Sequence, residues 1–292
     1  MATFDRWASA IDRTWEYRRF HAHHTEANSN YWAYWAVAHQ GQRIARPVAD
    51  SIETAALFRL QGDNARRAPR TVGEWLAAEK EAANWIRLST AVSMASYLET
   101  YLRQVTTLAL WSDPALTLGS TKLIDGVAVL KRRNSELDVS SSVDKMVKGL
   151  WSSRIDAYRR IFGVAPARLD TQAVELQALQ TLRNRVSHEF GRDNSMSHLA
   201  AMAPLTSAVR LSEGRLMKWL GMVEEVAQAI DSHLLNSHIG AFECLLLLHR
   251  ERERRRRALD VSTFRKLIAA AASGPIVNTE YCRMAMSFYR RA

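Results

Sequence analysis

Residues 170–192 read DTQAVELQALQTLRNRVSHEFGR, a stretch that predicts one long amphipathic helix. Asp170 or Thr171 can cap its start, and Gly191 can end it. On an ideal helix, which turns by about 100° per residue, the large apolar side chains fill one arc. That arc consists of Leu176, Leu179, Leu182, Val186 and Phe190. We expect it to face the core of an all-α fold.

Arg183 interrupts this pattern, because its direction falls inside the apolar arc. An unpaired buried charge costs several kcal/mol, so this side chain must reach solvent or an anionic partner. A residue that breaks the polar–apolar pattern of an otherwise regular helix is expected to belong to a functional site. Asn184 and His188 are four residues apart and lie together on another side of the helix.

Arg183 and His188 are five residues apart, which places them about 140° apart around the helix. One straight helix therefore cannot direct both side chains at the same small target. Two arrangements would solve this problem. The helix is distorted near His188, or the site is built from two copies of the helix across a two-fold axis.

The six residues from Arg183 to His188, RNRVSH, resemble the R-x4-6-H motif of the HEPN superfamily. In that family an arginine precedes a polar residue, often Asn or His, and a histidine follows after a few positions. Its members are small α-helical domains, and many are metal-independent RNA endonucleases of toxin–antitoxin and antiviral systems. The Leu-rich helix before the motif and the long helices on both sides extend the resemblance over about residues 71–250.

The resemblance implies that Arg183, Asn184 and His188 are catalytic and that Arg185 and Arg192 bind RNA. Histidine suits proton transfer near neutral pH, and arginine suits charge stabilisation at the phosphoryl oxygens. The amide would orient the phosphate or the histidine. The nucleophile would be the RNA 2′-hydroxyl, leaving a 2′,3′-cyclic phosphate. The resemblance also implies a homodimer with a composite active site, an antitoxin or defence-system partner, and no metal or other cofactor.

Phe190 is a departure from one branch of the family. In HEPN toxins silenced by a nucleotidyltransferase partner, the motif continues His-x-Tyr, and that tyrosine is modified. Phe190 stands at the matching position and has no hydroxyl to modify. The chain therefore resembles HEPN families from other defence and RNA-related contexts.

Two other functions fit the same features. One is a catalytically inactive HEPN module that binds RNA or assembles proteins, and the other is a nucleotide-sensing domain. A nucleoside triphosphatase has no support, since Gly62 and Gly73 are isolated and form no phosphate loop. The sequence also contains no Gly-x-Ser-x-Gly or His-Glu-x-x-His motif.

The composition favours a helical protein with a polyanionic partner. Gly and Pro are sparse among the 292 residues, which favours helices. The net charge of +10 favours nucleic acid as the partner. Cys244 and Cys282 are too few for a disulfide framework or a zinc site and suggest a reducing compartment. The N-terminus is not a signal peptide, and no apolar run reaches the roughly 18 residues of a membrane span, so we expect a cytoplasmic protein.

We divide the chain into three predicted segments. They are an N-terminal aromatic-rich helical region at 1–70, a HEPN-like helical domain at 71–250 and a basic C-terminal helical extension at 251–292. Aromatic residues concentrate in 28–40, which we interpret as an intramolecular docking surface, with base stacking or partner binding as alternatives. The histidine-rich residues 21–24 are interpreted as a polar loop in preference to a metal site.

Periodicity and capping residues predict the other helices. Their predicted ranges are 3–20, 47–60, 72–111, 122–133, 140–162, a long helix after Ser212, 262–272 and 278–289. Thr71 and Glu74 form a capping box before the longest helix. On that helix, Glu99 is a candidate counter-charge for an arginine, with an exposed position as the alternative. The charge run 250–257 either contacts RNA or is solvated, and His233 and His238 are interpreted as helix-surface or interface residues.

Overall fold

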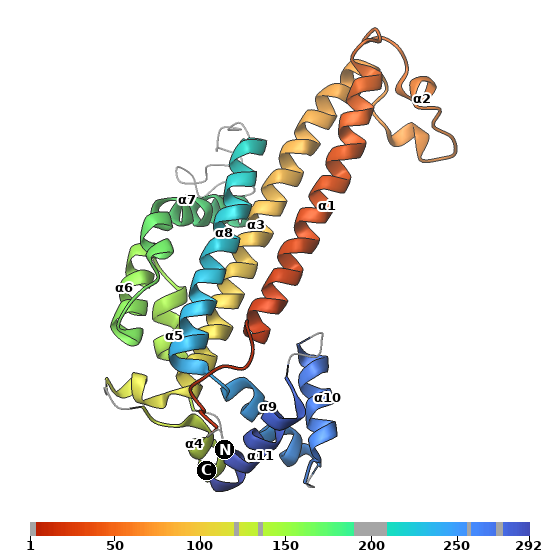
Figure 1. The fold of residues 1–292 in the computed structure, drawn as a ribbon. Coiled ribbons are helices and arrows are strands. Elements are labelled where there is room, and N and C mark those ends of the chain that lie inside the picture. The colour runs from red at the N-terminus through yellow and green to blue at the C-terminus, as the bar shows by residue number, and fades with distance from the viewer. Residues whose placement is uncertain (1–3, 120–122, 134–136, 190–208, 256–257, 273–276) are drawn as a thin grey trace. The chain divides into compact units, whose positions relative to one another are not determined.

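The computed structural model describes residues 4–119, 123–133, 137–189, 209–255, 258–272 and 277–292 (Figure 1). Within these ranges the regular structure is helical, and the only β pairing is an isolated bridge between Glu53 and Thr71. The predicted all-α fold class is therefore confirmed. No helix of the described ranges combines the length and the apolar character needed to cross a bilayer.

The described ranges contain eleven α-helices. In chain order they are α1 (Trp15–Ala45), α2 (Thr54–Leu57), α3 (Val72–Ser112), α4 (Gly126–Arg133), α5 (Ser140–Val147), α6 (Trp151–Phe162), α7 (Ala167–Glu189), α8 (Glu213–Leu234), α9 (Phe242–Arg255), α10 (Val261–Ala271) and α11 (Thr279–Arg291). Short 3-10 turns lie at Ala65–Arg67 and Pro114–Leu118, and a π-helical turn lies at Leu235–Ile239.

The chain forms two compact units. Unit 1 comprises Met1–Ala22, Tyr97–Gln177 and Met222–Ala292, and unit 2 comprises His23–Ser96 and Ala178–Gly221. These units do not coincide with the predicted segments 1–70, 71–250 and 251–292. The reason is that the long helices α1 and α3 each contribute residues to both units.

In unit 1, a buried arginine organises the chain before α1. Arg6 is 3% exposed, and its Nε donates to Asp125 Oδ1 at 2.9 Å. Its other nitrogens donate to the Ser112 side chain and to the carbonyls of Ser112 and Ile239. The Ala241 N–H in turn donates to the Arg6 carbonyl at 2.9 Å. Gly240, at φ 53°, permits this approach, since a Cβ there would lie 2.5 Å from the Arg6 carbonyl oxygen.

These contacts explain why the predicted helix at 3–20 is wrong before Trp15, whereas residues 15–20 are helical as predicted. The backbone before Thr14 bonds to distant residues and to side chains, and α1 begins only at Trp15. Thr14 caps the helix, because its Oγ1 accepts a hydrogen bond from the Tyr17 N–H at 3.1 Å. Once started, α1 continues through residues 21–24, so the predicted polar loop there is also wrong.

Three other predicted helices are shorter or divided. Of 47–60, only Thr54–Leu57 is helical, because the backbone pairs with the segment before α3, as in Val72 N–H to Ile52 O at 2.9 Å. The predicted helix 140–162 divides into α5 and α6 around Gly149, whose φ is 85°. The predicted helix 122–133 begins later, at Gly126.

Helices with clear capping chemistry match their predictions. In the capping box of α3, the Thr71 N–H donates to Glu74 Oε2 at 3.2 Å, and the Glu74 N–H donates to Thr71 Oγ1 at 3.3 Å. Ser212 caps α8 through a hydrogen bond from the Arg215 N–H. Helices α10 and α11 lie within one or two residues of their predicted ranges.

In unit 2, α1 and α3 run antiparallel side by side (Figure 1). Tyr31 of the aromatic stretch is 2% exposed, and its hydroxyl donates to Glu213 Oε2 at 2.9 Å. Asn84 of α3 binds the segment before α8 through both ends of its amide, to Val209 and Leu211. The interpretation of residues 28–40 as a docking surface is therefore confirmed for Tyr31, whereas Trp32 is 39% exposed.

Candidate functional site

The motif residues lie in the last turns of α7. This helix begins at Ala167, directly after Pro166 and three residues before the predicted cap at Asp170, so that predicted start is wrong. It is α-helical without interruption as far as Glu189, and the predicted end at Gly191 lies outside the described residues. The apolar arc is buried as predicted at Leu176, Leu179, Leu182 and Val186.

The structure brings two of the predicted catalytic residues into contact. Arg183 is half-buried, as expected for a charge placed inside the apolar arc, and Asn184 is exposed. The Arg183 Nη1 donates to Asn184 Oδ1 at 3.0 Å. Because this bond uses the amide oxygen of Asn184, the NH2 group of Asn184 can still donate to an acceptor other than Arg183.

The other predicted site residues are placed in part. His188 belongs to the last turn of α7, but its side chain lies outside the described residues, as do Phe190 and Arg192. Arg185 is exposed. Because α7 is regular up to Glu189, positions 183 and 188 of its backbone lie about 140° apart around the helix axis.

Glu99 of α3 pairs with an arginine, as one of the two interpretations predicted. Its partner in unit 1 is Arg154 of α6, whose Nη2 lies 3.3 Å from Glu99 Oε1. Arg154 is 4% exposed, and its Nε also donates to the Gly149 carbonyl at 3.0 Å. This ion pair therefore belongs to the packing of unit 1 and not to the motif.

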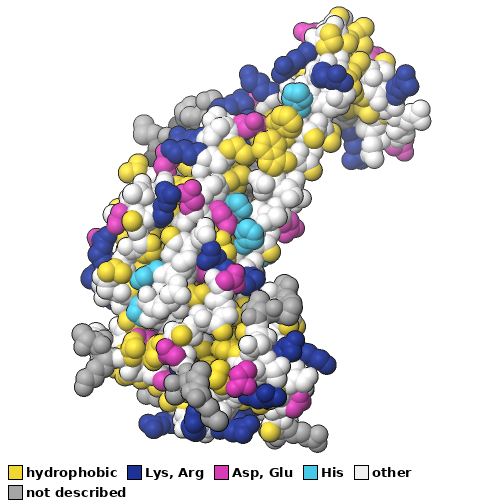
Figure 2. Space-filling model, viewed as in Figure 1, with side chains coloured by type: hydrophobic (Ala, Val, Ile, Leu, Met, Phe, Trp, Pro, Cys, Tyr) yellow, Lys and Arg dark blue, Asp and Glu magenta, His cyan; other side chains and the backbone are white. Residues whose placement is uncertain are grey.

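The basic run at the end of α9 is partly neutralised by its own residues. Glu251 Oε2 lies 2.7 Å from Arg254 and 2.9 Å from Arg255, and hydrogen bonds from these arginines lower the pKa of Glu251 to about 2. On the face shown in Figure 2, acidic side chains lie among the Lys and Arg side chains. RNA contact at residues 250–257 stays a prediction.

The histidines outside the motif make contacts that sequence reasoning missed. His21 Nδ1 lies 2.9 Å from Glu224 Oε1, and His24 Nε2 lies 3.0 Å from the Leu220 carbonyl. In the part of the chain that the structure describes, no three His, Cys, Asp or Glu side chains form a group suited to a metal ion.

His233 and His238 are partly buried in unit 1, where both contact α6, so the interface alternative of their interpretation describes them better than the surface one. The Tyr158 hydroxyl lies 2.7 Å from His233 Nδ1, and the His238 ring packs on Phe162 with 5.2 Å between ring centroids. Burial, with a smaller contribution from His238, lowers the pKa of His233. Tyr158 is 75 residues away from His233, and no local pattern could have identified this contact.

Comparison with known proteins adds no further assignment: no protein-family profile, no curated protein and no solved structure matches the chain. The interpretation of the site therefore rests on the residues of α7 and their geometry.

Proposed function

We propose that the chain is a metal-independent endoribonuclease of the HEPN type, with Arg183, Asn184 and His188 as its catalytic residues. The observation that carries this proposal is the contact between the Arg183 guanidinium and the Asn184 amide, on the same helix end as His188. These three residue types occur in the order of the HEPN motif, RNRVSH. The net charge of +10 is consistent with an RNA substrate.

The chemistry assigned to each residue follows from its functional group. His188 exchanges a proton with the 2′-hydroxyl or with the leaving 5′-oxygen. Arg183 donates to the phosphoryl oxygens as negative charge develops on them. Asn184, held through its oxygen by Arg183, presents its NH2 group to the phosphate or to the histidine. Arg185 and Arg192 bind phosphates of the flanking RNA.

The proposed active site combines residues of two chains. A regular α7 separates the directions of Arg183 and His188 by about 140°, so one copy of the helix cannot direct both side chains at one phosphate. A two-fold axis beside α7 solves this, because Arg183 of one protomer then faces His188 of the other. A neighbouring antitoxin or defence-system protein would restrain the activity of such a dimer.

The first experiment incubates the protein with total RNA in EDTA and analyses the ends of the fragments. We expect cleavage that leaves 2′,3′-cyclic phosphates, and a loss of at least about 100-fold in rate for His188→Ala. His23→Ala is the matched control, since it removes an exposed histidine from α1. Equal cleavage by His188→Ala and the parent protein would overturn the assignment.

A mixing experiment tests the composite site. Arg183→Ala and His188→Ala are each expected to be inactive alone, whereas their mixed dimer contains one site with an intact Arg183 and an intact His188. Recovered activity on mixing supports the two-chain site, and no recovery in a verified mixed dimer contradicts it. If the folded, dimeric parent binds RNA without cleaving it, the catalytically inactive RNA-binding or assembly module is the better description.

A further inference from the structure

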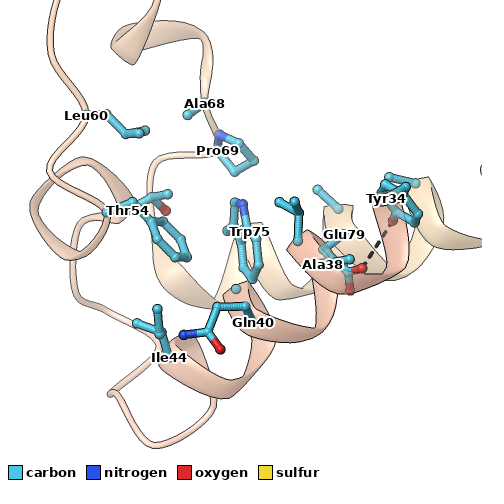
Figure 3. A pocket seen from close by; sticks show the side chains of 15 residues that line it. Tyr34, Ala38, Gln40, Ile44, Thr54, Leu60, Ala68, Pro69, Trp75 and Glu79 are labelled. Atoms are coloured by element: carbon cyan, nitrogen blue, oxygen red, sulfur yellow. Dashed lines mark hydrogen bonds between the residues drawn. The ribbon is translucent and has the colours of Figure 1, made fainter. Parts of the chain in front are cut away.

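Unit 2 contains a cavity of about 620 Å³ between α1, α3 and the segment that connects them (Figure 3). This volume lies within the range of about 300–1,000 Å³ that is typical of small-molecule sites. Its walls are mainly apolar, and polar side chains enter at only a few positions. Those positions are Tyr34, Gln40, Thr54 and Glu79.

One wall of the cavity is aromatic. Trp75 stands at its centre (Figure 3), and the ring of Phe58 lies at a centroid distance of 4.8 Å from Trp75. Gly41 of α1 leaves room for the indole, because a Cβ at this position would lie 2.8 Å from Trp75 Cη2. The faces of aromatic rings attract cations, and tryptophan does so most strongly.

A carboxylate faces the same cavity without a cationic partner. Glu79 is 9% exposed and accepts a hydrogen bond from the Tyr34 hydroxyl at 3.2 Å (Figure 3). It accepts a second one from Gln42 Nε2 at 2.5 Å. Both donors are neutral, and across the described ranges no Lys, Arg or His side chain makes an ion pair with Glu79. Each carboxylate oxygen can accept a further hydrogen bond.

The Tyr34 hydroxyl lies next to Glu79 and is a weak acid in this position. Burial, together with the charge of Glu79 and the hydrogen bond to it, raises the pKa of Tyr34 to about 12. Arg87 acts on Tyr34 in the opposite sense, but its Nε donates to the Leu211 carbonyl at 2.7 Å. The Tyr34 hydroxyl therefore keeps its proton at neutral pH and donates a hydrogen bond to Glu79.

Thr54 supplies a second polar contact point in the lining. This residue is 1% exposed, and its Oγ1 is buried without a hydrogen-bond partner in the described part of the chain. A buried hydroxyl without a partner is unfavourable, and a ligand atom inside the cavity would remove that cost.

We propose that this cavity binds an apolar organic amine in its protonated form. The ammonium group donates to Glu79, and the hydrocarbon body lies against Trp75 and Phe58. A cation is favoured over a neutral ligand because it neutralises a nearly buried carboxylate. An anion is disfavoured because it would add a second negative charge. The site contains none of the residues Arg183, Asn184 and His188, so it is independent of the proposed nuclease activity.

Three matched compounds test the proposal: 4-phenylbutylamine, 4-phenylbutanol and 4-phenylbutanoate, titrated by calorimetry and by tryptophan fluorescence. We expect the amine to bind the parent protein at least about tenfold more tightly than the alcohol, because charge-assisted hydrogen bonds are the stronger ones. The carboxylate is expected to bind most weakly. This preference is measured on the parent protein and requires no variant.

Two variants locate the binding. Glu79→Gln is expected to lower the affinity for the amine about tenfold and to remove its advantage over the alcohol. Glu26→Gln is the matched control, since it removes the same charge from an exposed position on α1. Ala38→Trp fills the cavity and is expected to abolish binding of the amine and the alcohol, with its helix content checked by circular dichroism.

Several outcomes would overturn the proposal. They are equal affinity of the parent for all three compounds, no binding at millimolar concentration, or unchanged binding by folded Ala38→Trp. None of these outcomes bears on RNA cleavage. Failure of the amine site and failure of the nuclease proposal are therefore distinguished.

Discussion

Helix α3 carries one partly or largely buried carboxylate in each compact unit, Glu99 and Glu79, and the two have different kinds of partner. In unit 1, Glu99 pairs with Arg154 at 3.3 Å. In unit 2, Glu79 accepts hydrogen bonds from the neutral side chains of Tyr34 and Gln42 and faces a cavity. Removing a charge from water is costly unless a partner compensates it. The comparison indicates that the Glu99 pair serves the packing of unit 1, whereas Glu79 is the carboxylate to which we assign the ammonium group of a ligand.

The largest effect is expected from breaking the pair in unit 1. Arg154→Met leaves the Glu99 charge in place and should lower the free energy of unfolding by about 4 kcal/mol, the cost typical of a broken buried pair. Urea denaturation at neutral pH measures this loss. Arg103→Met is the control, because Arg103 pairs with Asp144 at the surface of the same unit. If both variants unfold at the urea concentration of the parent, the Glu99 pair does not stabilise unit 1.

The next effect concerns a carboxylate in unit 1 that has hydrogen bonds in place of an ion pair. Asp231 is fully buried, accepts a hydrogen bond from Thr14 Oγ1 at 2.5 Å, and has its pKa raised by burial from 3.8 to about 6. Because the folded protein holds the Asp231 proton more tightly than the unfolded chain, protonated Asp231 adds to the free energy of unfolding. This contribution is fully present below pH 3.8 and is lost as the pH rises through about 6.

Asp231→Asn removes this titration. At about 1.36 kcal/mol per pKa unit, the free energy of unfolding of the parent should fall by about 2 kcal/mol relative to that of the variant between pH 4 and pH 7. Urea denaturation across this pH range measures the difference. Because the pKa of His233 is lowered, the titration of His233 makes the free energy of unfolding rise with pH. This rise is the same in the parent and in the variant, so it cancels when the two are compared. A difference that does not change with pH would contradict the assignment.

A smaller effect is expected at the start of α3 in unit 2. Thr71→Ala removes one half of the reciprocal cap and should lower the free energy of unfolding by about 1 kcal/mol. The preference for the amine over the alcohol should not change, since Glu79 is two turns further along the helix. A lost preference would show that the ligand site depends on the helix start and not on Glu79 itself.

The smallest effect is expected from neutralising the carboxylate of unit 2. Glu79→Gln should change the free energy of unfolding by less than about 1 kcal/mol, because losing a charge-assisted hydrogen bond and removing an uncompensated charge act in opposite directions. Melting temperatures measured with and without 4-phenylbutylamine test the role of Glu79 more directly. The amine should raise the melting temperature of the parent and leave that of Glu79→Gln nearly unchanged. Equal increases in both proteins would contradict the role of Glu79.

Much of the fold was predictable because it depends on local patterns. The capping box at Thr71, the cap at Ser212 and the apolar arc of α7 each involve residues within a few turns of one another. The non-helical segment before α1 was not predictable from such patterns, although the cap at Thr14 is itself local. It depends on the Arg6 carbonyl bonding to Ala241, more than two hundred residues away.

For the site, the sequence by itself determined the motif, the all-α class and the placement of Arg183 within the apolar arc, because helical periodicity fixes directions along one helix. The tertiary structure decided which arginine meets Glu99, 55 residues away, and that Tyr34 meets Glu79, 45 residues away. It also decided that a cavity opens beside Glu79. Ion pairs and cavities depend on which distant residues come together, and that information is absent from any short stretch of the chain.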